Sequence, residues 1–184
     1  MAGTIHHGLV IRKSPKLPLH AYCDADWAGD KEDYISTTGY VTFIGSNPIS
    51  WSSKKQRALS RSSTEAEFRA IADTTTEVLW LQNLLRELHI TNTSSPVIFC
   101  DNLSATHYSA NPVFHSRMKH LALSFHFVRE HVQKGTIRIQ HINGEDQLAD
   151  TLTKPLLRAR FQLLASKIGL TLRPPILRER IKDI

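Results

Sequence analysis

The sequence predicts an α/β protein with a mixed five-stranded sheet and helices packed on both of its faces. Three observations support this fold class: an alternating segment followed by two β-rich runs, a long helical repeat, and two short apolar runs separated by a helix. Strands that alternate with helices are typical of a partly parallel sheet. The predicted order of elements is β-β-β-α-β-α-β-α, within one domain over residues 17–168.

The first half of the chain predicts a meander and a helix. Residues 17–27 (LPLHAYCDADW) alternate by twos, which predicts a strand with one apolar face. The runs TTGYVTFIG and NPISWSSK follow, joined by a short turn at Gly45–Pro48, and complete three antiparallel strands. Residues 64–89 repeat apolar side chains at helical spacing without Gly or Pro, which predicts a long amphipathic helix.

The second half predicts the parallel part of the sheet. Residues 97–102 (VIFCDN) are almost wholly apolar, and such a run suits a strand covered on both faces. A polar, His-rich stretch and a second helix, in which Phe125 and Val128 share the apolar face, lead to the strand TIRIQHI at 136–142. A final helix begins in EDQLADTLTK and restarts at Pro155.

Composition limits the class of protein. The 184 residues include 23 Lys+Arg and 17 Asp+Glu, so the formal net charge is +6, which favours a polyanionic partner such as nucleic acid. The chain has no run long enough to span a membrane and no signal-peptide pattern. Cys23 and Cys100 form no disulfide framework, and we expect both to be buried strand residues of a reducing compartment. We therefore expect a soluble, intracellular protein without a membrane partner, in the cytoplasm or the nucleus.

Four acidic residues stand where local structure gives no reason for a charge: Asp24, Glu67, Asp101 and Asp150. Asp24 and Asp101 lie toward the ends of predicted strands, where functional groups of α/β sheets gather. Carboxylates gathered in one place repel each other unless a cation joins them, and oxygen ligands favour Mg²⁺ or Mn²⁺. Two such ions can support the in-line hydrolysis of a phosphodiester. The pattern therefore favours metal-dependent cleavage of nucleic acid.

Each acid also has an ordinary structural explanation. Asp24 could be a solvated strand residue, Asp101 could cap the next helix, and Asp150 could interact with a helix dipole. The four acids together, on this topology, favour the metal site over these separate explanations.

Two glutamates compete for the position at the start of the long helix. Ser62 with Glu65 and Thr64 with Glu67 both form capping-box patterns. At about 100° per residue, Glu67 lies about 50° from the centre of the apolar stripe and Glu65 about 110°. We therefore expect Glu67 to face the sheet edge and Glu65 to face water.

Several motifs in a fixed order resemble a known family. They are YCDADWAGD, STTGY, ISWSSKKQ, SSTEAEFRAI, FCDN, MKH, HFVRE and QLADTLTKP. From about residue 3 to residue 169, the chain resembles the ribonuclease H domain of Copia-type retrotransposon Pol polyproteins, especially those of plants. The resemblance implies a ribonuclease H-like fold and endonucleolytic hydrolysis of the RNA strand of RNA–DNA hybrids with two Mg²⁺ ions.

The resemblance also implies roles for single residues. The family's metal-binding carboxylates match Asp24, Glu67, Asp101 and Asp150, an order that disfavours an integrase-type site, whose glutamate comes last. His141 resembles a family histidine that assists proton transfer or product release, and a strand histidine at the edge of the core is the alternative explanation.

A further set of residues borders the predicted site as candidate contacts with the hybrid: Lys54, Lys55, Gln56, Ser62, Ser63, Asn102, Lys119 and His120. Proteins read a hybrid through backbone shape and ribose hydroxyls. Lys119 and His120 match a Lys-His pair of the family, and an exposed basic start of a helix explains that pair equally well.

The organisation of the chain raises an alternative function. Residues 1–16 look like a junction upstream of the domain at 17–168, and residues 169–184 form a basic tail. The family places a reverse transcriptase before this domain, and that polymerase is absent here, so we expect a truncated retroelement protein. The alternative is a catalytically silent remnant that acts at most as a nucleic-acid- or partner-binding module.

Overall fold

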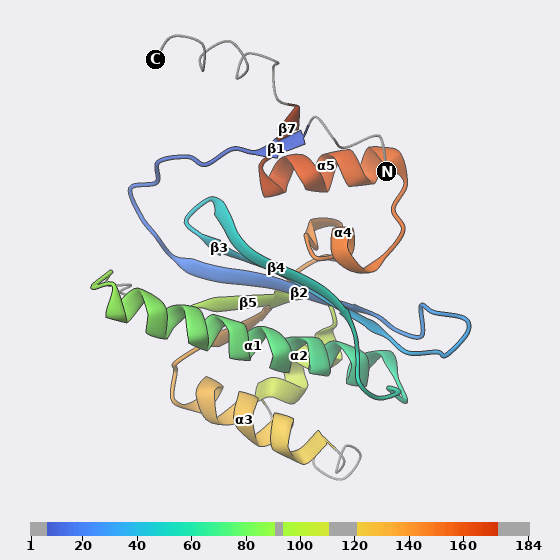
Figure 1. Cartoon of the computed structure of the whole chain (residues 1–184). Helices are drawn as coiled ribbons and strands as arrows, with labels where there is room; N and C mark the ends of the chain where they lie inside the picture. The colour runs from blue at the N-terminus through green and yellow to red at the C-terminus, as the bar shows by residue number, and fades with distance from the viewer. Residues whose placement is uncertain (1–6, 91–93, 111–120, 173–184) are drawn as a thin grey trace.

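Two layers of helices enclose a five-stranded sheet (Figure 1). The computed structural model describes residues 7–90, 94–110 and 121–172, so Lys119 and His120 lie outside the described residues. The strand order is β4-β3-β2-β5-β6. Among the residues in these three ranges, no helix has the length and apolar character needed to cross a membrane.

The first three strands form the predicted meander. They are β2 (Leu19–Asp26), β3 (Thr37–Ile44) and β4 (Asn47–Lys55), each antiparallel to the next. A two-residue turn joins β3 to β4, and its Gly45 has a φ of 61°, which glycine adopts without the steric cost of a Cβ atom.

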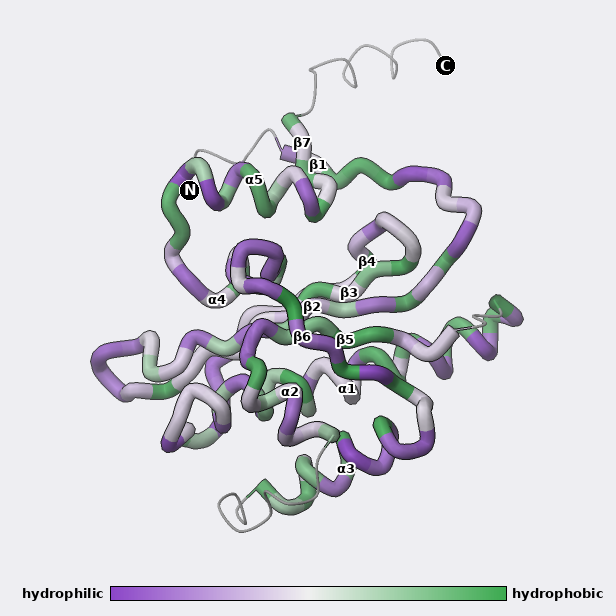
Figure 2. The backbone as a smooth tube through the Cα atoms, turned by 180° about the vertical axis from the view of Figure 1, so that it is seen from behind, coloured by the Kyte–Doolittle hydropathy of each residue, from purple (hydrophilic) through white to green (hydrophobic). Residues whose placement is uncertain are grey.

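The parallel part of the sheet also follows the prediction. Strand β5 (Val97–Cys100) runs parallel to β2, and β6 (Arg138–His141) runs parallel to β5. Figure 2 shows the sheet from behind, with β6 beside β5. The α/β fold class and the mixed five-stranded sheet are therefore confirmed.

One face of the sheet is covered by α1 (Ser63–Glu87), α2 (Leu103–Ala110) and α3 (Ala122–Gln133) (Figure 1). Their buried side chains pack on β2 and β5 in one hydrophobic cluster, which includes both cysteines of the chain. Helix α2 lies in the His-rich stretch, where the sequence did not predict a helix. It is short and buries only Ala105 and Ser109, so its apolar pattern is weak.

The other face is covered by α4 (Asp150–Thr153) and α5 (Arg158–Ile168), after a 3₁₀ turn η4 at Gly144–Asp146 (Figure 2). A second hydrophobic cluster forms there from the sheet and these helices: Val41, Phe43, Leu148, Leu164 and Ile168. Strand β2 has the predicted apolar face, formed by Leu19, Ala21, Cys23 and Ala25. Its other face is covered as well, because Tyr22 packs against the second cluster and stacks on Phe99 of the neighbouring strand, with ring centroids 5.0 Å apart.

A small second sheet joins the two ends of the described chain. Strands β1 (His7–Leu9) and β7 (Leu170–Leu172) pair antiparallel beside α5. The sequence did not predict these three-residue strands. They lie in segments that the sequence assigns to the junction and the tail, and the division of the chain at residues 17 and 168 stays a prediction.

Candidate active site

The predicted acids on β2 and β5 meet at one edge of the sheet. Asp24 lies near the carboxyl end of β2, and Asp101 directly follows the parallel strand β5. Asp150, the first residue of α4, completes the group. Asp24, Asp101 and Asp150 each bring one carboxylate oxygen within 4.8 Å of the other two.

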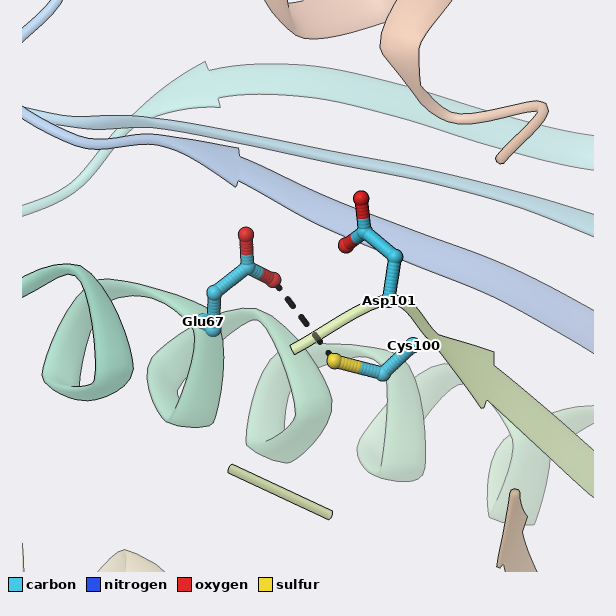
Figure 3. Close-up of side chains that lie close together, drawn as sticks. All are labelled: Glu67, Cys100 and Asp101. Atoms are coloured by element: carbon cyan, nitrogen blue, oxygen red, sulfur yellow. Dashed lines mark hydrogen bonds between the residues drawn. The ribbon is translucent and has the colours of Figure 1, made fainter. Parts of the chain in front are cut away.

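Glu67 reaches the same place from the first turns of α1. Ligand atoms of Glu67, Cys100 and Asp101 all lie within 4.8 Å of one another, and Asp101 belongs to both groups. Figure 3 shows the Glu67 and Asp101 carboxyl groups pointing to the same side, with the Cys100 thiol donating to Glu67 Oε2 over 3.7 Å. The structure therefore brings all four predicted acids together.

The expectation for Glu65 was wrong in one respect. Ser62 caps α1 by accepting a hydrogen bond from the Glu65 N–H, at 3.1 Å, as the capping box predicts. The Glu65 side chain, however, is only 2% exposed and does not face water. Its carboxylate accepts from the Arg61 N–H at 3.1 Å and pairs with Arg69 at 2.9 Å, so the arginine one turn later covers it.

Burial and mutual repulsion change the acidity of the site. Burial raises the pKa of Glu67 far above the ordinary value of a glutamic acid, and the nearby Cys100, Asp24 and Asp101 raise it further. The pKa of Asp101 is raised for the same two reasons, burial first and the Asp24 charge second. Negative charge is therefore in excess here, and a cation would stabilise the ionised carboxylates.

A lysine already provides one cationic group. Lys154 Nζ lies 2.9 Å from Asp24 Oδ1 and 3.0 Å from Asp150 Oδ1. Burial disfavours the Lys154 ammonium, but the Asp24 charge and the two hydrogen bonds outweigh it and raise the pKa of Lys154. The second oxygen of Asp24 accepts a hydrogen bond from the Thr153 hydroxyl. The Lys154 ammonium thus binds oxygens of Asp24 and Asp150, and the Asp101 carboxylate lies beside them. Closely spaced carboxylate oxygens of this kind also suit a hard divalent ion.

The position of α4 depends on two residues that the sequence did not single out. Gln147 is fully buried; its Nε2 donates to the Cys23 carbonyl at 2.8 Å, and its Oε1 accepts from the Ala149 N–H at 3.2 Å. Gly39 lies opposite Asp24 in the β2–β3 register, and a Cβ atom there would come within 2.6 Å of the Thr153 Cγ2. Both residues thus allow α4 to pack directly on the sheet beside Asp24.

Arg160 of α5 also contacts the site. Its Nη2 lies 3.3 Å from Asp150 Oδ2, and its Nη1 donates to the Glu145 carbonyl at 3.1 Å. The sequence offered a signal for Lys154, which follows Asp150 at the i,i+4 spacing of helical ion pairs. It offered none for Arg160, because that contact depends on how α5 packs.

His141 lies at the border of the acid cluster. It ends β6, opposite Cys100 in the register, and its Nε2 lies 3.1 Å from the Asp101 carbonyl oxygen, which accepts the hydrogen bond. The imidazole is exposed. The structure therefore places this residue next to one of the four acids and within reach of solvent.

Gln56, one of the candidate contacts with the hybrid, is bonded inside the protein. Its Nε2 donates to Thr38 Oγ1 at 3.0 Å and to the Ala66 carbonyl at 2.9 Å, while its Oε1 accepts from the Ser60 hydroxyl at 2.7 Å. The side chain is buried, and these bonds attach the end of β4 to the start of α1. This geometry favours a structural role for Gln56.

The remaining candidate contacts differ in how they are bonded. Lys55 forms ion pairs with two aspartates of the β2–β3 loop, Ser62 caps α1, and Asn102 accepts from the Ala105 N–H at 2.9 Å. Lys54 and Ser63 are exposed. Lys54 lines a groove of about 520 Å³ between β4 and α1 together with Arg57 and Arg69.

Comparisons with curated proteins give close relatives. The chain is 59% identical over 175 residues, 95% of its length, to the retrovirus-related Pol polyprotein from transposon RE1 of Arabidopsis thaliana. It is 57% identical over the same share to that from transposon RE2, and 37% identical over 83% of its length to that from transposon TNT 1-94 of Nicotiana tabacum. The chain spans 12%, 12% and 11% of these polyproteins. No family model matches the chain.

Comparisons with solved structures give the same fold at low identity. The N-terminal RNase H domain of a Mycobacterium tuberculosis protein, solved as a fusion with maltose-binding protein, has a TM-score of 0.53 and 12% identity. The match covers 82% of this chain and 98% of that one. LC11-RNase H1, solved in complex with an RNA/DNA hybrid, has a TM-score of 0.53 and 16% identity over 73% of this chain and 93% of its own.

Proposed function

Because this chain is a homologue of plant Copia-type Pol polyproteins over a short part of their length and has the ribonuclease H fold, we propose that it is a ribonuclease H domain. It hydrolyses the RNA strand of RNA–DNA hybrids by internal cleavage with two divalent metal ions, Mg²⁺ or Mn²⁺. In a complete polyprotein, its substrate would be the hybrid that a reverse transcriptase makes.

A single observation supports the proposal most strongly. Three aspartates, on β2, directly after β5 and at the start of α4, bring oxygens within 4.8 Å of one another at the carboxyl ends of two parallel strands. Burying several carboxylates side by side is unfavourable for stability. Function explains the arrangement, because closely spaced carboxylates are what hard metal ions require.

Four residues would hold the metal ions: Asp24, Glu67, Asp101 and Asp150. Bound divalent ions supply charge neutralisation and an activated water for in-line attack on the phosphodiester. The protein holds two of the ligands in place, because Thr153 bonds Asp24 and Arg160 bonds Asp150. The Cys100 thiol similarly orients Glu67.

His141 would move a proton at the edge of the site. With Nε2–H donating to the Asp101 carbonyl, the other ring nitrogen carries a lone pair and can accept a proton. Because the ring is exposed, it can exchange that proton with water. The alternative, a purely structural histidine, predicts that His141→Ala lowers stability and leaves the pH profile of cleavage unchanged.

The hybrid would lie over the exposed basic residues near the acids. Lys54 and Ser63 offer a positive charge and a hydroxyl to backbone phosphates and ribose hydroxyls, which proteins use to recognise hybrids by shape. The bonds that Lys55, Gln56, Ser62 and Asn102 make inside the protein favour indirect roles for those four.

Cleavage of a labelled hybrid tests the proposal. We expect the purified chain to cut an RNA–DNA hybrid internally in Mg²⁺, to stop after chelation of the metal, and to leave single-stranded RNA and duplex DNA intact. Asp24→Asn is the matched control, since it keeps the side-chain shape and removes the charge. A folded protein that binds the hybrid but does not cut it would favour the silent binding module instead.

A further inference from the structure

Lys154 forms hydrogen bonds with two of the carboxylates that the proposed function assigns to metal ions. Its Nζ bonds one oxygen of Asp24 and one oxygen of Asp150. We propose that the Lys154 ammonium is an internal counter-ion that leaves these carboxylates when a divalent ion binds, so that lysine and metal compete for one place. The inference rests on the proposed function, since it assigns the ion to the same carboxylates.

All four oxygens of Asp24 and Asp150 have partners in the structure. Besides the two bonded to Lys154, the second oxygen of Asp24 accepts from Thr153, and the second oxygen of Asp150 faces Arg160 at 3.3 Å. Each of these oxygens keeps a second lone pair, so the neutral Thr153 hydroxyl can stay when an ion binds, whereas a cationic partner of the same carboxylates opposes the ion by charge repulsion.

Lys154 is the partner best able to move. The Thr153 hydroxyl oxygen also lies 3.3 Å from the Ala149 carbonyl oxygen, so both can share its one hydrogen, and Arg160 also donates to two backbone carbonyls. Within the described residues, both hydrogen bonds of the Lys154 ammonium go to the Asp24 and Asp150 carboxylates. Its side chain is 35% exposed, which gives the ammonium a path to water.

Charge makes the ammonium and a divalent ion compete for these carboxylates. Two cations within contact distance of the same carboxylate oxygen repel each other strongly where water is scarce, and the Asp24 side chain is fully buried. The flexible stem of lysine lets its charge swing outward, whereas the rigid arginine fork is held by several bonds. We therefore expect the Lys154 ammonium to leave the carboxylates whenever a divalent ion binds to them.

Amine labelling of the wild-type protein tests the exchange directly. The protein is labelled with a dilute acylating reagent over a Mg²⁺ titration at constant ionic strength, and each lysine is quantified by mass spectrometry. We expect Lys154 labelling to rise several-fold along the same curve as Mg²⁺ binding measured by calorimetry. Lys134, an exposed residue paired with Glu130, is the internal reference and stays unchanged. Unchanged or slower labelling of Lys154 while Mg²⁺ binds would overturn the inference.

Two variants separate competition from a general effect of charge. Lys154→Met should bind Mg²⁺ about tenfold more tightly, a difference of about 1.4 kcal/mol. Arg160→Met removes one positive charge from the same Asp150 but leaves the Lys154 bonds, so it should gain much less. Equal gains in both variants, or weaker binding by Lys154→Met, would contradict the competition. If neither wild type nor Lys154→Met binds Mg²⁺, the proposed function itself fails, and this inference fails with it.

Discussion

Two clusters of acids, each with a lysine, have opposite electrostatics because one is buried and the other is exposed. The buried cluster contains Asp24, Glu67, Asp101, Asp150 and Lys154, and the loop cluster contains Asp30, Asp33 and Lys55. In the buried cluster, the pKa values of Glu67 and Asp101 are raised. In the loop cluster, a hydrogen bond from Lys55 lowers the pKa of Asp30, and a backbone N–H and then Lys55 lower that of Asp33.

The difference separates a structural ion pair from a functional site. In the loop cluster, water and backbone N–H groups solvate each acid, so two aspartates and one lysine form an ordinary surface turn. In the buried cluster, four carboxylates share two cationic side chains, Lys154 and Arg160, and burial and mutual repulsion still raise the pKa of Glu67 and Asp101. The two clusters therefore differ in burial and not in residue type, and the buried one has the closely spaced carboxylates that hard metal ions require.

Replacing one aspartate in each cluster should give the largest contrast. We expect Asp24→Asn to lower the rate of hybrid cleavage by more than the ~10- to 100-fold that loss of a residue supporting a metal ligand costs. Asp30→Asn should leave the rate within about twofold, because it touches only a solvated pair. Initial rates on the labelled hybrid at saturating Mg²⁺ measure both. Equal losses of cleavage rate in the two variants would mean that the exposed carboxylates of the loop cluster matter for cleavage as much as the buried ones.

Gly39→Ala should disturb the buried cluster without changing any charge. The added methyl group would meet Thr153 and Leu152, so α4, which carries Asp150, must move away from the sheet. We expect a loss of about 1–3 kcal/mol in the free energy of unfolding and weaker Mg²⁺ binding. Denaturant unfolding and calorimetry measure the two effects.

The control for this prediction is Gly135→Ala, at a position with a φ of 67° and no other atom within 4 Å of the added methyl. It should lower stability through backbone strain and leave Mg²⁺ binding unchanged. If Gly39→Ala bound Mg²⁺ as tightly as wild type, the close contact between α4 and the sheet at Gly39 would not be needed for Mg²⁺ binding.

The sequence predicted the sheet and the acids because both depend on short-range patterns. Alternation in residues 17–27 and the apolar run at 97–102 are local signals, and parallel pairing then brings Asp24 and Asp101 to one edge. The helical wheel favoured Glu67 over Glu65, Asp150 had no local reason for its charge, and the family resemblance then implied a metal-binding role for both.

Features that depend on packing could not be predicted in the same way. A helical wheel gives the angle of Glu65 but not the Arg69 side chain that covers it. The contact of Lys154 with Asp24 spans 130 positions in the sequence, and the need for Gly39 appears only once α4 lies on the sheet. Strands of three residues, such as β1 and β7, are too short to show a period.

Glu67→Gln should change how stability depends on pH. The pKa of Glu67 is raised in the folded protein, so above the ordinary glutamate pKa of about 4.5 the unfolded chain releases a proton that the folded protein keeps. The Glu67 contribution to the free energy of unfolding is therefore largest below that pH and falls as pH rises, by at most ~1.4 kcal/mol per pH unit. Glutamine cannot ionise, so the variant should gain stability over wild type as pH increases.

Unfolding curves with the metal chelated, from about pH 5 to about pH 8, measure this difference. Asp30→Asn is the matched comparison: the pKa of Asp30 is lowered from 3.8, so its contribution changes only below that value, and the curve of this variant should stay parallel to wild type over this range. Parallel curves for wild type and Glu67→Gln would show that Glu67 is ionised in the folded protein.

The smallest effect should come from Lys55, and its neighbour Lys54 provides the contrast. Lys55 is held by Asp30 and Asp33, so Lys55→Gln should barely change the affinity for an RNA–DNA hybrid. Lys54 is exposed and lines the same groove as Lys55, Arg57 and Arg69. Lys54→Gln should weaken binding and lower the slope of log affinity against log salt concentration by about one. Fluorescence anisotropy at several salt concentrations, in an Asp24→Asn background that prevents cleavage, measures both. A larger loss for Lys55 would mean that the loop cluster opens to bind phosphate, and the contrast between a structural and a functional cluster would no longer hold.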